Sequence, residues 1–249
     1  MKPTLLLFLS CLLLFSCTTE SQTTGTESSQ ADVHFYGDQI SVEMADKMME
    51  ALGGRKKWAA VKALYIKANH IGQGPEDSYQ SETWRDLSDF KVRMERQNDR
   101  FHSIGLFSDA GGWVMSGDDG STNELDETAM SNLRFGNAHN LYVMWKRLAT
   151  DPGYQVDFQG SNREISFHQG LDLLCAFILD ERNLPVRFIA PLPNGEAGPP
   201  SDFRKWAETD GLWHPVSGGP SDSSFVYQTE VWQPSFKGFE ESFEVAYQP

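Results

Sequence analysis

A regular alternation of apolar and polar side chains marks two stretches of the chain and constrains its fold more than any other feature. In residues 64–69 and again in residues 90–95, apolar side chains occupy the even positions and more polar ones the odd positions. Successive side chains of a strand point to opposite faces. This period of two therefore predicts strands with one face in the core and one in water.

Strands are predicted along most of the chain. Residues 171–179 are apolar on both faces, which is typical of a strand covered on both sides. Residues 191–200 and 217–224 are rich in Pro, Gly or Ser and predict two loops. The remaining predicted strands are 80–86, 100–107, 111–116, 154–160, 163–169, 172–180, 185–190, 202–208, 225–232 and 242–247.

Two helices are predicted. The first covers residues 41–52, with Ser41 as candidate N-cap and the glycine pair 53–54 ending the helix. Its apolar side chains recur at a spacing of four and share one face, as in Met44, Met48 and Leu52. The second helix is predicted at residues 138–149, and residues 118–136 before it are polar and weakly helical.

The order of these elements predicts the fold class. One helix, several strands, a helical insertion and then many strands indicate an α+β fold with an antiparallel sheet. About eleven strands are more than an open sheet carries without curling, so we expect a curled sheet with a concave face. The helices are then expected to cover or plug that face.

The N-terminus predicts export and lipidation. Residues 5–15 are almost all Leu and Phe, a run too short to span a bilayer as a helix, which needs ~20 residues, but typical of a signal peptide. Residues 14–17 read Leu-Phe-Ser-Cys and resemble the lipobox of bacterial lipoproteins. That resemblance implies cleavage after Ser16 and lipid on Cys17; the alternative is an ordinary signal peptide with an incidental cysteine.

The expected organisation follows from this N-terminus. Residues 1–16 form the signal peptide, residues 17–32 a lipidated polar tether, and residues 33–249 a single domain. The formal net charge of −14 argues against nucleic acid as a partner and against electrostatic adhesion to anionic lipid. Contact with the membrane is therefore expected through the lipid on Cys17.

No motif in the sequence predicts catalysis, a metal or a cofactor. There is no nucleophile elbow, P-loop or dinucleotide-binding glycine pattern, and the six histidines lack metal-ligand spacing. The acidic residues 118–126 do not fit the spacing of a calcium loop. Cys175 lies in an apolar run and is expected to be a buried hydrophobe rather than a nucleophile.

Aromatic residues make up 12% of the chain and are the remaining signal. If those on predicted strands face the concave side of the sheet, they line a cavity for an apolar ligand. The alternative is that they fill the space between sheet and helices. The candidate cavity residues are Trp84, Phe90, Val92, Met94, Trp113 and Trp206, with Trp232 nearby in the same pattern.

A family resemblance supports the cavity. Residues 51–54 read Ala-Leu-Gly-Gly, Trp58 follows, and residues 61–65 read Val-Lys-Ala-Leu-Tyr. Together with residues 151–156, 179–180 and 184–186, this pattern resembles the LolA/LolB-like lipoproteins of the bacterial envelope. The resemblance implies a half-barrel of antiparallel strands, a helical lid, and binding of acyl chains or other hydrophobic ligands.

The sequence thus predicts a non-enzymatic envelope lipoprotein that binds an acyl chain or lipid. Two alternatives stay open: a scaffold that docks an envelope partner through residues 118–136 and 191–201, and a hydrolase acting on a glycan or lipid. Thr18 stands where inner-membrane retention signals have Asp, so analogy favours the outer membrane.

Overall fold

The computed structural model describes residues 34–222 and 224–238. They belong to one compact unit, residues 32–249, and the hydrophobic core is built from residues within that unit. The predicted signal peptide, the tether with Cys17 and the strand at 242–247 lie outside the described residues.

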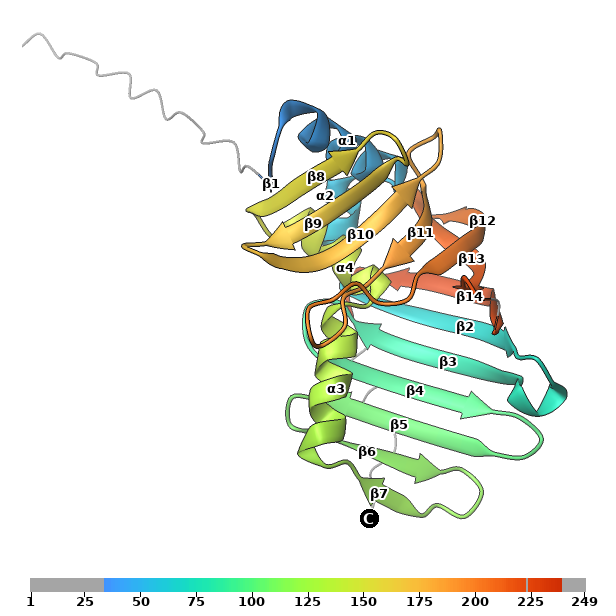
Figure 1. Ribbon diagram of the computed structural model, residues 1–249. Coiled ribbons are helices and arrows are strands. Elements are labelled where there is room, and N and C mark those ends of the chain that lie inside the picture. The colour runs from blue at the N-terminus through green and yellow to red at the C-terminus, as the bar shows by residue number, and fades with distance from the viewer. Residues whose placement is uncertain (1–33, 223, 239–249) are drawn as a thin grey trace, which may run out of the picture. The chain divides into compact units, whose positions relative to one another are not determined.

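The described residues form one sheet of fourteen strands in the order β1-β8-β9-β10-β11-β12-β13-β14-β2-β3-β4-β5-β6-β7 (Figure 1). Neighbouring strands are antiparallel except β1 and β8, which are parallel. The strands are β1 (Phe35–Tyr36), β2 (Ala63–Ile71), β3 (Tyr79–Asp86), β4 (Lys91–Gln97), β5 (His102–Ser108), β6 (Gly111–Ser116), β7 (Thr122–Glu124), β8 (Tyr154–Gln159), β9 (Glu164–Gln169), β10 (Asp172–Leu179), β11 (Pro185–Ile189), β12 (Ser201–Thr209), β13 (Leu212–Pro220) and β14 (Val226–Ser235).

The sheet is curled and unclosed, as the sequence predicts. In its order, β12, β13, β14, β2 and β3 separate β11 from β4, yet Phe188 of β11 and Met94 of β4 line the same cleft. Only a curled sheet brings such distant strands to face one space. The end strands β1 and β7 pair with β8 and β6 and not with each other, so the α+β half-barrel stays open.

Four α-helices lie in the described part of the chain: α1 (Gln39–Ala51), α2 (Arg55–Ala60), α3 (Glu127–Ala138) and α4 (Leu141–Thr150). α3 crosses one end of the strands from β3 to β6 (Figure 1). Its Met130 lies against Gly112 of β6, and its Asn137 accepts a hydrogen bond from Arg85 of β3. α3 therefore covers one face of this half of the sheet.

Tryptophans fill the space between α2, α4 and the sheet. The rings of Trp58 and Trp145 lie 5.0 Å apart, and those of Trp145 and Trp206 lie 6.0 Å apart. Trp232 of β14 lies 6.2 Å from Trp58 and 4.1 Å from His214, on which it stacks. In this part of the concave face the aromatic excess forms packed core rather than a cavity.

The first helix ends as predicted but begins earlier. Gly53 and Gly54 have φ of 110° and 90°, the left-handed region that favours glycine. At the other end the N-cap is Asp38 and not Ser41, because the Asp38 carboxylate accepts a hydrogen bond from the Ser41 amide at 2.9 Å. Ser41 is buried, and its hydroxyl accepts a hydrogen bond from the Phe158 amide.

The predicted loop at 217–224 is wrong in its first part, because residues 217–220 belong to strand β13. Pro215 has no amide hydrogen to donate, and it lies next to an irregularity in the pairing of β12 with β13, where such a residue is tolerated. Gly218 also belongs in the strand, because a side chain there would collide with the Asp202 carbonyl.

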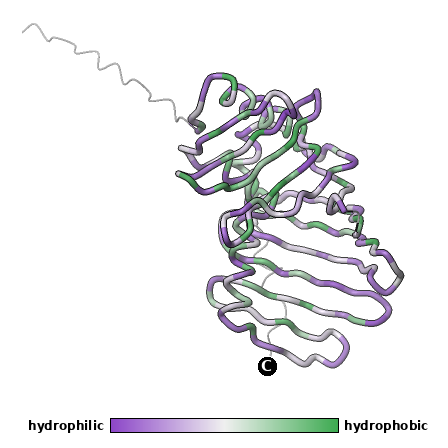
Figure 2. The backbone as a smooth tube through the Cα atoms, in the orientation of Figure 1, coloured by the Kyte–Doolittle hydropathy of each residue, from purple (hydrophilic) through white to green (hydrophobic). Residues whose placement is uncertain are grey.

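Strand β10 is hydrophobic along most of its length, as predicted (Figure 2). Four consecutive residues, Leu174 to Phe177, are buried, so both faces of this strand are covered. Cys175 is among them, and burial raises the pKa of its thiol. This thiol is therefore a protonated core side chain.

Candidate ligand-binding cleft

A cleft of about 590 Å³ lies between the concave face of the sheet and the junction of α3 with α4. Its walls come from β2, β3, β4 and β14 on one side and from β11 and β12 on another. The segment from Gly136 to Tyr142, where α3 ends and α4 begins, closes part of it. The volume lies in the range typical of ligand pockets, roughly 300–1,000 Å³.

Apolar side chains form one part of the lining. They come from strands β2, β4, β11 and β12 and from the start of α4. The apolar residues are Ile66, Ala68, Met94, Leu141, Phe188 and Phe203. Ala68, Phe188 and Phe203 are largely buried, so this wall is fixed by core packing.

Polar side chains form the other part, and two arginines and two histidines are among them. Arg85 donates a hydrogen bond to Asn137 at the end of α3. Burial lowers the pKa of the Arg85 guanidinium to about 10, so it stays protonated at neutral pH. Arg96 is the second arginine of the lining.

Both histidines of the cleft are neutral at neutral pH. Burial and the nearby charge of Arg96 lower the pKa of His70. His70 also shares a hydrogen bond of 2.9 Å with the Ser81 hydroxyl and stacks on Tyr79. Burial lowers the pKa of His139, whose Nδ1 lies 2.9 Å from the Phe135 carbonyl oxygen. The positive charge of the lining is therefore that of its arginines.

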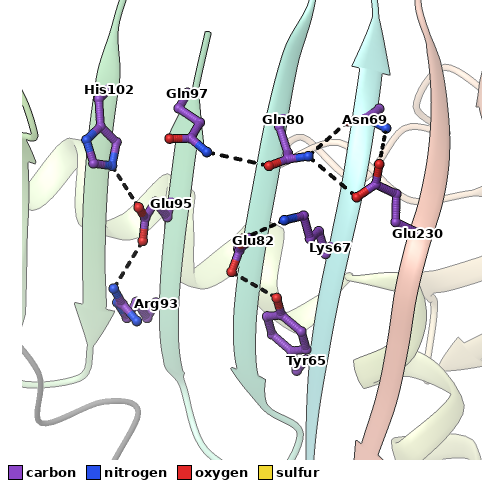
Figure 3. Close-up of polar contacts among 10 residues, drawn as sticks. All are labelled: Tyr65, Lys67, Asn69, Gln80, Glu82, Arg93, Glu95, Gln97, His102 and Glu230. Atoms are coloured by element: carbon purple, nitrogen blue, oxygen red, sulfur yellow. Dashed lines mark hydrogen bonds and ion pairs between the residues drawn. The ribbon is translucent and has the colours of Figure 1, made fainter.

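The opposite face of the same strands carries a network of paired polar side chains (Figure 3). Glu82 accepts a hydrogen bond from Tyr65 at 2.8 Å and pairs with Lys67 at 3.1 Å. Glu95 pairs with Arg93 at 3.1 Å and contacts His102 at 2.7 Å. On this face Lys67 and Arg93 each have a carboxylate partner, whereas Arg85 and Arg96 of the cleft form no ion pair with a carboxylate of the described residues.

This arrangement confirms the alternation from which the strands were predicted. Tyr65, Lys67 and Asn69 share one face, as do Arg93 and Glu95 (Figure 3). The alternating apolar positions turn toward the helices, where Ile66, Ala68 and Met94 line the cleft.

The six candidate cavity residues are not all brought together. Met94 lines the cleft, and Val92 lies two positions away on the same strand face, buried against the core. Phe90 lies in the turn before β4 and is partly buried. Trp206 belongs to the packed tryptophan cluster, 6.0 Å from Trp145.

Trp84 and Trp113 lie on the face away from the cleft. Directly paired residues of neighbouring strands point to the same face, and the register runs Trp84–Arg93–Leu106–Trp113. The Arg93 guanidinium lies over the Trp84 ring, 4.4 Å from its centroid. Trp113 and Val92 border a separate small hollow of about 120 Å³.

Sequence reasoning missed the two arginines of the cleft. Residues at positions 81, 83 and 85 of β3 share its cleft face and are Ser, Thr and Arg. A rule that places apolar residues inward assigns this face to solvent. The pairing with β2 places Arg85 beside Leu64 on the cleft face, and no pattern within β3 itself indicates this.

Two features are absent from residues 34–222 and 224–238. No group of three or more His, Cys, Asp and Glu side chains there is placed to hold a metal ion. No helix in that part of the chain has the length and hydrophobicity needed to cross a membrane.

Comparisons with known proteins identify similar folds. No protein-family model matches the chain, and no curated protein matches it by sequence. A DUF1329 family protein from Desulfovibrio piger is similar in structure, with a TM-score of 0.50 and 9% identity over 82% of this chain and 97% of that one. This similarity concerns the fold alone.

Two other solved structures resemble the chain more weakly. The LolA superfamily protein NE2245 from Nitrosomonas europaea has a TM-score of 0.49 and 10% identity, covering 82% of this chain and 96% of that one. A domain from Vibrio parahaemolyticus, provisionally described as an outer membrane lipoprotein-sorting protein, has a TM-score of 0.45 and 8% identity, covering 84% and 97%. The open, curled sheet of antiparallel strands that the sequence resemblance implies is present in the structure itself.

Proposed function

We propose that the protein is a non-enzymatic, lipid-anchored protein of the cell envelope that binds an acyl chain or lipid in the cleft. One observation carries the proposal: the curled sheet and the α3–α4 junction enclose about 590 Å³ with a partly apolar lining. An apolar ligand that replaced water there would gain roughly 25 cal/mol for each Å² of its apolar surface buried.

The envelope location rests on the N-terminal sequence. The apolar residues 5–15 and the Leu-Phe-Ser-Cys at 14–17 support export and lipidation of Cys17, and Thr18 supports the outer membrane. A Cys17→Ser chain should lose incorporation of labelled fatty acid and accumulate as an uncleaved precursor of higher mass. Equal labelling of both chains would contradict the anchor.

The partner-docking alternative concerns residues 118–136 and 191–201. Residues 127–138 form α3, whose C-terminal end borders the cleft, but most residues of the segment 118–136 are exposed, so this segment keeps the alternative open. Residues 191–201 are largely outside regular structure and keep this alternative open.

The first test is mass spectrometry of organic extract from residues 32–249 purified without detergent from bacterial cells. A reproducible apolar molecule near one equivalent is the expected result. Two neighbouring residues of β2 offer a matched pair of variants, because Ala68 faces the cleft and Lys67 the opposite side.

The paired variants make the test specific. Ala68→Trp should fill the cleft and remove the bound molecule, whereas Lys67→Trp should keep it. Circular dichroism establishes that both variants are folded. An empty native protein, or equal ligand content in both folded variants, would overturn the cleft as the binding site.

A further inference from the structure

The charges of the cleft differ in kind from those of the rest of the molecule. The chain carries a formal net charge of −14, yet its cleft lining contains Arg85 and Arg96 and no Asp or Glu among the described residues. A lining that is partly apolar and partly cationic suits a ligand that has one apolar part and one anionic part. We infer that the cleft binds an anionic amphiphile, with an alkyl or acyl chain and a negatively charged head group.

Arg85 carries most of this inference. Its guanidinium presents five N–H donors, and in the described part of the chain its hydrogen-bond acceptor is the neutral amide oxygen of Asn137. No ion pair with a described carboxylate compensates its charge, in contrast to Arg93 on the opposite face, which pairs with Glu95. A partly buried cation without a counter-charge is costly, and an anionic ligand would remove that cost.

Arg96 extends the cationic part of the lining along β4. Its charge is close enough to His70 to lower the pKa of that imidazole. Arg96 pairs in register with Ser81, four residues before Arg85 on β3. Four residues of a strand span roughly 13 Å, so the two arginines are well separated along the lining.

Between the two arginines the lining is suited to a hydrocarbon chain. Met94 lies between them on β4, and Ile66 and Ala68 lie on β2, on the other side of β3. Phe188 and Phe203 close the space from β11 and β12. A single chain would therefore contact apolar side chains while its head group meets an arginine; we place the head at Arg85, whose charge is the more buried.

The start of α4 also favours a head group near Arg85. Asn140, Leu141 and Tyr142 line the cleft, and Asn140 is the N-cap of this helix. The N-terminus of a helix carries a partial positive charge and stabilises nearby anions. The partial charge of the α4 N-terminus adds to the charge of Arg85 and does not form a site by itself.

The inference rests on the proposed function, so its test must separate charge selectivity from binding. Three ligands with the same dodecyl chain do so: dodecyl phosphate, dodecyl maltoside and dodecyltrimethylammonium, which are anionic, neutral and cationic. Their affinities for residues 32–249 are measured below their micelle concentrations, by displacement of the neutral fluorescent probe N-phenyl-1-naphthylamine. We expect dodecyl phosphate to bind about ten-fold or more tightly than dodecyl maltoside.

Variants assign the selectivity to Arg85. Arg85→Gln should weaken dodecyl phosphate about ten-fold and leave dodecyl maltoside unchanged, and Arg85→Lys should restore part of the loss. Arg93→Gln is the matched control, because it removes an arginine from the opposite face of the neighbouring strand. Thermal unfolding by circular dichroism shows that each variant is folded.

Each outcome has a defined meaning. Equal affinity for the three dodecyl ligands would overturn the anionic head group and leave the proposed function standing. Binding of none of them, with the probe also excluded, would overturn both. A folded Arg85→Gln protein that loses the neutral ligand as well would make Arg85 a structural residue and overturn its role as the anion-binding group.

Discussion

The indole rings of Trp58 and Trp145 meet edge to face, with their centroids 5.0 Å apart. Both side chains are completely buried. Trp58 also donates a hydrogen bond from Nε1 to the Leu52 carbonyl at 3.0 Å, just before the glycine pair that ends α1. This contact therefore ties α1, α2 and α4 together on the concave face of the sheet.

Replacing Trp58 should be among the most destabilising single changes in the chain. Trp58→Ala removes a fully buried ring and should lower the free energy of unfolding by about 3–5 kcal/mol. Trp58→Phe keeps an aromatic ring but loses the hydrogen bond to Leu52. Its stability should therefore lie between that of the native chain and that of Trp58→Ala. Urea unfolding of residues 32–249, followed by circular dichroism, measures these differences.

Leu171 provides the control for this prediction. Its side chain is fully exposed at the β9–β10 turn, so Leu171→Ala should change the free energy of unfolding by no more than about 0.5 kcal/mol. A Trp58→Ala protein as stable as the Leu171→Ala protein would show that the tryptophan contact does not hold the helices.

Replacing two glycines by alanine should change the stability in opposite directions. Gly136 lies within α3, and Gly112 of β6 lies against it. Gly136 lies in the helix with ordinary backbone angles, and a Cβ atom there would have no described neighbour within 4 Å beyond its own helix backbone. Gly136→Ala should therefore raise the free energy of unfolding by roughly 0.5–1 kcal/mol. A Cβ at Gly112 would lie 2.5 Å from Met130 Sδ.

Gly112→Ala should accordingly lower stability, by about 1–3 kcal/mol as is usual for overpacking. The same urea titration compares the two variants. A Gly112→Ala protein as stable as the native chain would contradict the packing of α3 on β6.

Stability should fall in mild acid because of His214. Its ring is buried and stacks on Trp232, and burial lowers its pKa from 6.5 to about 4. Below pH 6.5 the unfolded chain takes up a proton that the folded protein does not accept until about pH 4. This contribution to stability is therefore complete above pH 6.5 and is lost as the pH falls through that window.

His214→Phe keeps an aromatic ring against Trp232 and removes the titrating group. Urea midpoints measured from neutral pH down to about pH 4 should fall less steeply for this variant than for the native chain. His70 and His139 also have lowered pKa values and should keep part of the slope. An unchanged slope in the variant would contradict the assignment.

Local rules predicted the elements whose sequence and environment agree. The alternation of residues 64–69 predicted β2 and its two faces, because Ile66 and Ala68 pack inward while Tyr65 and Lys67 stay outside. The glycine pair predicted the end of α1, because only glycine readily adopts φ near +100° there.

Other features depend on contacts that no local pattern contains. Strand β13 escaped prediction because Pro215 and Gly218 are usual loop residues, and only their positions beside β12 make them acceptable. The face of Trp84 was undetermined until the register paired it with Arg93. Arg85 was missed because an inward arginine has a meaning only beside α3 and the cleft.

Removing one aromatic ring from the cleft, or one from the opposite face of the sheet, should show which face binds the ligand. Phe188 lines the cleft from β11, and Trp84 lies on the opposite face of the sheet beneath Arg93. Phe188 is only 9% exposed, so a hydrocarbon chain would cover a small part of its apolar surface, worth about 0.5 kcal/mol at roughly 25 cal/mol for each Å². We therefore expect the affinity of Phe188→Ala for a dodecyl ligand to fall about two-fold or more.

Trp84→Ala should lose some stability, because its ring contacts Arg93 and lies 4.9 Å from that of Tyr65, but its affinity for the same ligand should not change. Displacement of N-phenyl-1-naphthylamine gives the affinities, and urea unfolding gives the stability of each variant. A Trp84→Ala protein that stays folded and loses the ligand would place the binding surface on the outer face of β3, and the cleft would then not be the site.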